Sequence, residues 1–175
     1  MIKALILAAG RGSRLGELTK NMPKPEIEIA GKTVLQRIID NLHQHGVYQI
    51  IANCHYLPLI ITAKTGANCL FFYEEILLGH DGTISALKSW LEGDDFFVIN
   101  GDTISNVNYT EMKQQHKRGT INVLMDNWRA CGTWIYPKEY FTNKDISIVP
   151  YRPAGLVWWD IGTKERLKKA REFFK

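Results

Sequence analysis

The sequence predicts an α/β fold in three layers, in which a mostly parallel central sheet carries helices on both faces. Short apolar runs of strand length alternate along the chain with segments whose apolar residues recur at helical spacing. Such alternation favours βαβ units, in which the strands run parallel and the helices cover the sheet. The 175 residues are expected to form a single domain, 1–175, because this length buries a sizeable core and the sequence shows neither repeats nor a linker.

Each expected element follows from the spacing of its apolar residues. The first strand is the apolar run 2–7, and a half-exposed strand at 27–29 alternates isoleucine with glutamate. Thr33 is expected to cap a helix that Gly46 ends, since threonine favours the start of a helix and glycine the position beyond its last turn. Later strands are expected at 47–52, 68–73, 96–99, 120–125, 132–136, 147–149 and 155–159. Later helices are expected at 57–64, 82–90, 109–118 and 164–173.

The composition is ordinary for a globular protein, with 45% apolar and 23% charged residues. The net charge of +4 suits a small anionic substrate and is too diffuse for nucleic acid, which needs a clustered basic face. The basic run 164–175 alternates with apolar residues, so it is interpreted as the solvated face of a terminal helix. Neither a signal peptide nor a membrane span is expected, which favours a cytoplasmic location.

The three cysteines, Cys54, Cys69 and Cys131, match no metal-binding spacing. Cys54 and Cys69 lie in or beside apolar strands, where a free cysteine usually packs as a small apolar side chain. Buried free thiols in a reducing cytoplasm are therefore expected.

A glycine-rich stretch, LAAGRGSRL at 7–15, follows directly after the first predicted strand. Small residues and glycines at a strand end expose backbone N–H groups, which wrap a phosphate closely because no Cβ stands in the way. Arg14 and Lys24 add positive charge. The stretch predicts a polyphosphate-binding loop, although the short G-x-G match alone fits an ordinary turn after a core strand equally well.

Two other phosphate-binding motifs do not fit this stretch. The P-loop pattern G-x-x-x-x-G-K-[ST] does not occur in the sequence. The dinucleotide-binding pattern G-x-G-x-x-G begins at Gly10 and Gly12, but its third glycine position holds Leu15, and Gly16 comes one place late. The close packing of helix on strand that the third glycine allows is therefore lost.

Several polar or glycine-rich segments lie near the ends of predicted strands. In an open parallel sheet, ligands bind outside the carboxyl ends of the strands, so these segments are expected to share one edge. They are residues 10–14, 54–56, 79–82 and Asp102.

Asp102 and Asp160 are the candidate metal ligands. Each follows a predicted strand, and each could instead cap the next segment, which is a common use of aspartate. Mg²⁺ is usually held by one or two carboxylates together with waters and substrate phosphates. Two carboxylates that are distant in sequence but both lie at strand ends meet that requirement.

The run LAAGRGSRLGELTKNMPKPEIEIAGKTVL at 7–35 resembles the amino-terminal motif of the nucleotidylyltransferases that make nucleotide-sugars. NGD at 100–102 and DIGT at 160–163 resemble the segments that carry the two metal-binding aspartates of that family. LGHDGTI at 78–84 is similar to the segment L-G-T-x-G-x-[IAV] that flanks the base. The resemblance covers most of 1–110 and 132–173.

The resemblance implies a Rossmann-like fold and a Mg²⁺-dependent transfer of a nucleoside monophosphate from a nucleoside triphosphate to a sugar-1-phosphate, which releases pyrophosphate. Arg14 would neutralise the leaving pyrophosphate, Lys24 would hold the α-phosphate or the acceptor phosphate, and Asp102 and Asp160 would hold Mg²⁺. The implied catalytic residues are Arg14, Lys24, Asp102 and Asp160. The implied nucleotide-binding residues are Leu7, Ala8, Ala9, Gly10, Gly12, Arg14, Gly79, Gly82 and Asp102.

The sequence departs from the family pattern at three places. Gly16-Glu17 stands where the family commonly has a proline, and His80-Asp81 replaces a threonine and a small residue beside the base. Family members also carry extra strands, with a glutamate-lysine pair that contacts the sugar and its phosphate, where this chain passes almost directly from residue 126 to residue 131. Either another basic residue takes over, or the acceptor site is open, or activity is impaired. The candidate replacements are Arg129, Lys138 and Arg152.

Two alternative functions stay open at this point. A cytidylyltransferase for a small phosphorylated alcohol such as phosphocholine would suit a shortened acceptor region, and Trp158 and Trp159 could enclose a quaternary ammonium group. A nucleotide-binding subunit without catalysis is the other, although it would not need the two aspartates. The expected partners are the triphosphate and the sugar-1-phosphate, and a homo-oligomer is compatible with the sequence.

Overall fold

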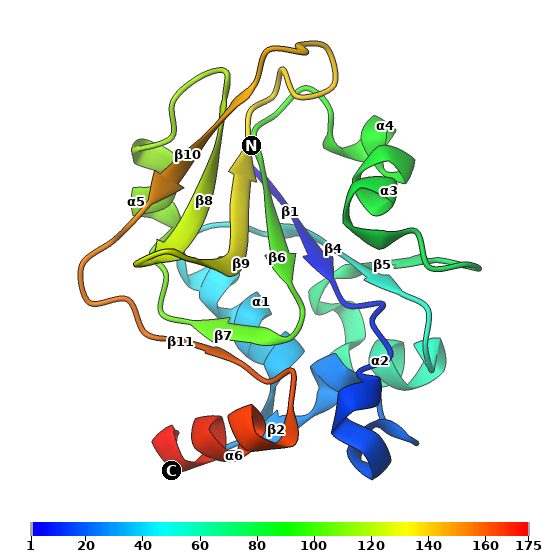
Figure 1. The fold of residues 1–175 in the computed structure, drawn as a ribbon. Coiled ribbons are helices and arrows are strands. Elements are labelled where there is room, and N and C mark those ends of the chain that lie inside the picture. Colours follow the sequence, from blue (N-terminus) through cyan, green and yellow to red (C-terminus); the bar gives the residue numbers. More distant parts are fainter. Residues whose placement is uncertain (1, 175) are drawn as a thin grey trace.

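The computed structural model describes residues 2–174, which form a twisted seven-stranded sheet flanked by helices (Figure 1). The strand order is β10-β8-β9-β6-β1-β4-β5. The strands are β1 (Lys3–Leu7), β4 (Gln49–Cys54), β5 (Leu70–Tyr73), β6 (Phe96–Asn100), β8 (Thr120–Asp126), β9 (Arg129–Tyr136) and β10 (Ser147–Tyr151). The helices are α1 (Val34–Gln44), α2 (Pro58–Thr65), α3 (Gly79–Ala86), α4 (Lys88–Leu91), α5 (Tyr109–Gln114) and α6 (Lys164–Phe173). Three short 3₁₀ helices complete the helical elements, η1 (Ser13–Thr19), η2 (Lys24–Glu26) and η3 (Gly66–Asn68).

The sheet is mostly parallel. β1 pairs in parallel with β4 and β6, β4 with β5, and β10 with β8, whereas β9 runs antiparallel to both of its neighbours. The carboxyl ends of the parallel strands therefore lie along one edge, and β9 alone in this sheet begins there and ends at the opposite edge. The predicted α/β class with a mostly parallel sheet is confirmed.

Alternating side chains of the central strands bury against helices on both faces of the sheet. In β1, Ala4 and Ile6 join a core cluster that contains apolar residues of α1, α2, α5 and α6, whereas Leu5 joins a second cluster with residues of α3 and α4. Ala4, Leu5 and Ile6 all have 0% exposure, as expected for a strand covered on both sides. The predicted three layers are confirmed.

The predicted cap of the first long helix is confirmed. Thr33 lies immediately before α1, and its side chain accepts a hydrogen bond of 3.1 Å from the amide of Gln36. α1 ends at Gln44, and Gly46 adopts a positive φ of 75°, which lets the chain leave the helix without strain.

Several element boundaries differ from the prediction, and four of the differences change the architecture. The helix expected at 82–90 is two helices, α3 and α4, that meet at Leu87. The helix expected at 109–118 ends at Gln114, and the side chain of His116 bonds to the side chain of Asn122 (Nδ1 to Oδ1, 2.8 Å). The strand expected at 155–159 is β11 (Trp158–Asp160), which leaves the main sheet and pairs antiparallel with β7 (Thr103–Ser105), a strand that the apolar pattern did not predict. The short strand at 27–29 is half of a ribbon, β2 (Glu28–Ile29) with β3 (Lys32–Thr33).

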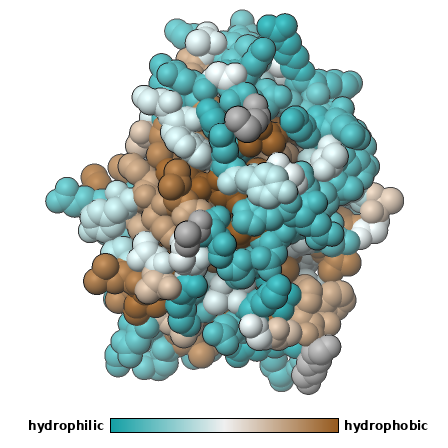
Figure 2. All heavy atoms as spheres, turned by 180° about the vertical axis from the view of Figure 1, so that it is seen from behind, coloured by the Kyte–Doolittle hydropathy of each residue, from teal (hydrophilic) through white to brown (hydrophobic). Residues whose placement is uncertain are grey.

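The surface is largely hydrophilic, with apolar side chains gathered in part of it. Figure 2 shows them at the centre and left of the rear face, the side where Figure 1 places α2 and β5. Exposed large apolar residues include Leu59 of α2 and Leu70 of β5, at 82% and 59% exposure. Within residues 2–174, none of the helices has both the length and the apolar character that crossing a bilayer requires.

Candidate active site

A cleft of about 360 Å³ lies where β1 and β6 end. Its walls come from the glycine-rich loop after β1, from η2 and from the turn after β6. The predicted site residues in these walls are Leu7, Ala8, Gly10, Gly12, Arg14, Lys24 and Asp102. The carboxyl edge of the sheet therefore gathers most of the predicted residues, as the strand-end argument expected.

Glycines allow the backbone segments of the cleft to approach closely. The amide of Gly101 donates to the carbonyl of Leu7 (2.9 Å), and a Cβ at Gly101 would lie 2.8 Å from that carbonyl oxygen. Gly12 has a positive φ of 69°, and a Cβ there would lie 3.0 Å from the Cβ of Lys24. Neither position accepts a side chain without a shift of its neighbours.

Asp102 and Asp160 lie side by side although 58 positions separate them in the numbering. β7 and β11 pair with Thr103 opposite Asp160, and the amide of Ile161 donates to the carbonyl of Asp102 (3.0 Å). The two carboxylates are partly exposed, at 29% and 26% of their side-chain surface. The β7–β11 ribbon, which the apolar pattern did not reveal, is the element that brings them together.

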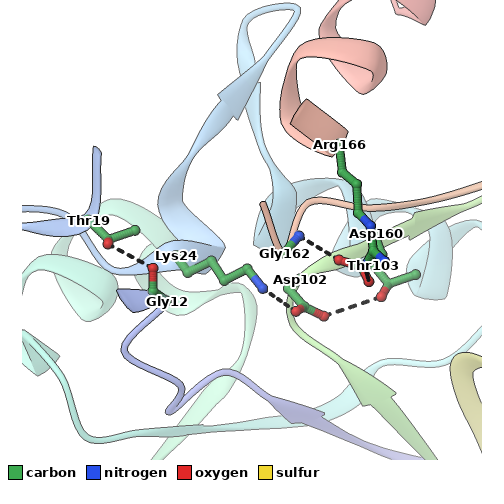
Figure 3. A network of polar contacts seen from close by, with 8 residues as sticks. All are labelled: Gly12, Thr19, Lys24, Asp102, Thr103, Asp160, Gly162 and Arg166. Atoms are coloured by element: carbon green, nitrogen blue, oxygen red, sulfur yellow. Dashed lines mark hydrogen bonds and ion pairs between the residues drawn. The ribbon is translucent and has the colours of Figure 1, made fainter. Parts of the chain in front are cut away.

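Each aspartate has a basic partner (Figure 3). Lys24, whose side chain is 8% exposed, forms an ion pair with Asp102. Arg166 of α6 donates through Nη1 to Oδ2 of Asp160 (2.5 Å), and the amide of Gly162 donates to Oδ1 (2.5 Å). The capping alternative for Asp160 does not hold, because Thr163 is the N-cap of α6 and accepts from the amide of Arg166 (3.3 Å).

Arg14 reaches the same place from the glycine-rich loop. A Cβ built on Gly162 would lie 3.2 Å from Nη2 of Arg14 and 2.6 Å from Oδ1 of Asp160. The guanidinium of Arg14 therefore lies next to the DIGT segment, and the four residues predicted to be catalytic converge. Asp160 itself is not part of the cleft wall but lies beside it, across the β7–β11 ribbon from Thr103.

The expectation of bare amides at Ala8 and Ala9 is wrong. Both N–H groups donate to Oδ1 of Asn53 at the end of β4, at 2.6 and 3.2 Å. The local pattern of small residues gave no sign of this, because the acceptor comes from a strand more than forty residues away. Within residues 2–174, the amides of Gly10, Arg11 and Gly12 have no such acceptor, so they stay available to an anion.

Gly79 and Gly82 open α3 and do not line the cleft. His80 packs against the sheet: its Nε2 lies 2.9 Å from the hydroxyl of Tyr136, and its ring lies 4.9 Å from that of Trp134. Burial lowers the pKa of His80, which favours a neutral ring in this packing position.

The three basic residues that could serve the acceptor lie at different edges. Lys138 follows β9 at the opposite edge, where it lines a second cavity together with Ile2 and Gly93. Arg129 is the first residue of β9 and Arg152 follows β10, so both lie at the same edge of the sheet as the cleft. Arg129 lies 5.3 Å over the ring of Trp158.

The donor set fits Mg²⁺. Two carboxylates lie beside a cleft that Arg14 and Lys24 line, and Mg²⁺ usually takes this small number of protein ligands when waters and phosphates complete its shell. Among the described residues, no group of three or more His, Cys, Asp or Glu side chains gathers as a dedicated metal cage.

The amino-acid sequence is similar to those of known proteins. The nucleotidyl transferase family model matches residues 3–128. The catalytic subunit beta of mannose-1-phosphate guanylyltransferase from Dictyostelium discoideum is 32% identical over 79% of this chain and 42% of its own length. The same-named subunit from Drosophila pseudoobscura pseudoobscura is 35% identical over 88% of this chain and 49% of its own length. The chain spans less than half the length of either relative.

Solved structures share the fold. HddC from Yersinia pseudotuberculosis, complexed with GMP-PN, superposes with a TM-score of 0.80 and 24% identity over 100% of both chains. UDP-glucose pyrophosphorylase from Acinetobacter baumanii superposes with a TM-score of 0.78 and 13% identity over 99% of this chain and 93% of its own. At these identities the likeness establishes the Rossmann-like fold alone. The family match, however, extends over most of the sequence, and this chain belongs to the nucleotidyl transferase family.

Proposed function

We propose that this chain transfers a nucleoside monophosphate from a nucleoside triphosphate to a sugar-1-phosphate and releases pyrophosphate. The observation that carries the proposal is the convergence of Arg14, Lys24, Asp102 and Asp160 at the carboxyl edge of the sheet. The two relatives compared above by sequence are catalytic subunits of mannose-1-phosphate guanylyltransferase, so GTP and mannose-1-phosphate are the first substrate pair to test.

The reaction requires no protein nucleophile. A phosphate oxygen of the acceptor attacks the α-phosphorus, a new P–O bond forms, and the bond from the α-phosphorus to the bridging oxygen of the pyrophosphate breaks. The acceptor phosphate is already ionised at neutral pH. The protein therefore contributes positioning and charge stabilisation, which supply much of the rate acceleration in such reactions.

The basic residues bind the phosphates, and the acidic residues bind the metal ion. Lys24 holds the α-phosphate or the acceptor phosphate, and Arg14 neutralises the leaving pyrophosphate with a planar group of several donors. The carboxylates of Asp102 and Asp160 hold Mg²⁺, which when bound offsets the negative charge of the phosphates. Lys24 is already desolvated against Asp102, so an entering phosphate gives this buried ammonium a second anionic partner.

Arg129 and Arg152 are the side chains that we assign to the acceptor phosphate. Trp158 lies two residues before Asp160 on β11, so the two side chains project from the same face of that strand, and the guanidinium of Arg129 stacks on Trp158. Arg152 donates through Nε to the carbonyl of Asn127 (3.0 Å) in the turn between β8 and β9.

The test is a pyrophosphate-release screen of four triphosphates against mannose-1-phosphate, glucose-1-phosphate and phosphocholine, with Mg²⁺ or with EDTA. We expect release with GTP and mannose-1-phosphate that EDTA abolishes. Turnover confined to phosphocholine would replace the proposal by the cytidylyltransferase alternative. Binding of a triphosphate without pyrophosphate release, whichever acceptor is offered, would favour the alternative of a nucleotide-binding subunit without catalysis.

Asp102→Asn and Asp160→Asn test the metal assignment. Each variant should lower kcat/KM by at least about 100-fold, equivalent to about 2.7 kcal/mol, because an amide is a poor substitute for an anionic Mg²⁺ ligand. Asp145→Asn, an exposed carboxylate outside the cleft, is the matched control and should leave turnover unchanged. Full Mg²⁺-dependent turnover in both site variants would refute the assignment.

A further inference from the structure

A buried polar network joins the glycine-rich loop to the start of α3, apart from the charged residues of the cleft. Its members are Asn53 at the end of β4, Glu74 just after β5 and Thr83 in α3. They are 4%, 2% and 0% exposed. Buried polar side chains of this kind specify one geometry when their hydrogen bonds are satisfied, and they destabilise the fold when they are not.

Asn53 uses both ends of its amide. Its Oδ1 accepts from the backbone amides of Ala8 (2.6 Å) and Ala9 (3.2 Å). Its Nδ2 donates to Oε1 of Glu74 (2.8 Å) and lies 3.2 Å from the hydroxyl of Thr83. The side chain thus holds the first two residues of the loop after β1 on one side and the carboxylate of Glu74 on the other.

Glu74 carries the connection on to α3. Its Oε1 accepts from the hydroxyl of Thr83 (2.5 Å), and its Oε2 accepts from the backbone amide of Leu78 (3.2 Å), the residue before α3. The hydroxyl of Thr83 also lies 2.8 Å from the carbonyl of Gly79 in the same helix. Within residues 2–174, Glu74 has no ion pair with a basic side chain, so neutral donors alone hold its carboxylate.

A buried carboxylate without a cation costs folding free energy relative to an apolar side chain of similar size. The carboxylate of Glu74 instead fixes the relative positions of three groups, because it accepts hydrogen bonds from Asn53, Thr83 and Leu78 at once. Of the two segments that the network joins, the loop after β1 lines the cleft, whereas contact of the start of α3 with the base is what the family resemblance implies.

We propose that Asn53, Glu74 and Thr83 are positioning residues for the nucleotide. They tie the glycine-rich loop to the start of α3, so that a nucleotide entering the cleft meets a loop that is already ordered. Preorganisation of this kind improves affinity by removing an ordering cost from the binding step. The network also occupies the amides of Ala8 and Ala9, which leaves phosphate the amides that follow, those of Gly10, Arg11 and Gly12. The inference rests on the proposed function.

Glu74→Gln is the test variant, because it keeps the size of the side chain and replaces one acceptor by a donor. In either orientation of the new amide, its NH₂ group faces N–H or O–H donors. Glu75→Gln, at the neighbouring exposed carboxylate, is the matched control. Two readouts are needed: amide hydrogen exchange without ligand, and Kd for Mg·GTP by calorimetry.

We expect Glu74→Gln to speed exchange at the amides of Ala8, Ala9 and Leu78, and to raise Kd at least about 10-fold with a smaller effect on kcat at saturation. Faster exchange with an unchanged Kd would overturn the inference, because the network would then be structural only. Failure of the unmodified chain to bind any triphosphate would instead overturn the proposed function, and this inference with it.

A second pair of variants applies if Glu74→Gln does not fold. Thr83→Ser keeps the hydroxyl that bonds to Glu74, whereas Thr83→Val removes it at nearly constant volume. The inference requires Kd to rise in the valine variant and to stay near the original value in the serine variant. Equal affinity in the two variants would refute it.

Discussion

At the scale of single residues, the side chain of Glu26 is fully buried next to the cleft. It has 0% exposure and follows Lys24 and Pro25 in the chain. Its Oε1 accepts from the hydroxyl of Thr65 (3.1 Å), whereas its Oε2 is buried without a partner in the described part of the chain. Burial raises the pKa of Glu26 above its ordinary value of 4.5. The folded chain therefore keeps Glu26 protonated to a higher pH than the unfolded chain does.

This shift makes stability depend on pH in a definite direction. The contribution of Glu26 to the free energy of unfolding is fully present below the unfolded-state pKa of 4.5 and falls as pH rises through the higher folded-state pKa. Glu26→Gln does not titrate, so we expect the variant to gain stability relative to the original chain as pH rises above 4.5. Urea midpoints measured between pH 4 and pH 8 check this.

The matched control for Glu26→Gln is Glu75→Gln, which changes an exposed carboxylate that does not act on Glu26. This control should keep the pH dependence of the unmodified chain. A Glu26→Gln variant whose stability fell with pH as steeply as that of the unmodified chain would show that the buried carboxyl is not the group responsible.

At the scale of elements, the β8–β9 hairpin is the segment that we propose contacts the acceptor. Its turn at Asn127 and Trp128 is tight, with a φ of 51° at Asn127, and it presents Trp128 at 91% exposure. Arg152 lies 5.7 Å over the ring of Trp128, so two arginine–tryptophan contacts occupy the carboxyl edge near Asp160. Arginine binds phosphate through a planar set of donors, which a stacked guanidinium leaves available at its edge.

Arg129→Gln should therefore weaken binding of the acceptor and leave binding of the nucleotide unchanged. We expect KM for the sugar-1-phosphate to rise at least about 10-fold, the usual size of one lost charged contact, while KM for the triphosphate stays within about twofold. Lys138→Gln, at the opposite edge of the sheet, removes the same charge and should change neither constant. A rise in KM for the triphosphate alone would place Arg129 on the nucleotide side.

At the scale of the whole molecule, the candidate site is assembled from four separate parts of the chain. They are the loop after β1, η2, the turn between β6 and β7, and the segment from β11 to α6. A ligand that contacts all four binds the folded state and not the unfolded chain. Binding should therefore appear as global stabilisation.

Mg·GTP at about 100 times its Kd should add about 2.7 kcal/mol of stability, which raises Tm by roughly 5–11 °C in a chain of this size. Scanning calorimetry with Mg·GTP, with GTP plus EDTA and with Mg²⁺ alone measures the shift. We expect the full increase only with Mg·GTP, because the triphosphate and the two aspartates share the metal. An equal shift with GTP plus EDTA would contradict a role for Mg²⁺ in binding.

The sequence by itself determined the fold class, the glycine-rich loop and the edge at which the site residues meet. Apolar spacing and glycine position are local properties of the sequence. The rule that ligands lie beyond the carboxyl ends of parallel strands then predicts where the site residues meet in the fold. Thr33 as a cap and Asp102 after its strand belong to this group.

The tertiary structure alone decided which groups each site residue contacts. Arg166 pairs with Asp160, Asn53 occupies the amides of Ala8 and Ala9, and β11 leaves the main sheet to pair with β7. In all but the first of these, the partners lie far apart in the chain. A hydrogen bond between such groups leaves no periodicity in the sequence, because it depends on where two elements cross and not on the pattern within either one.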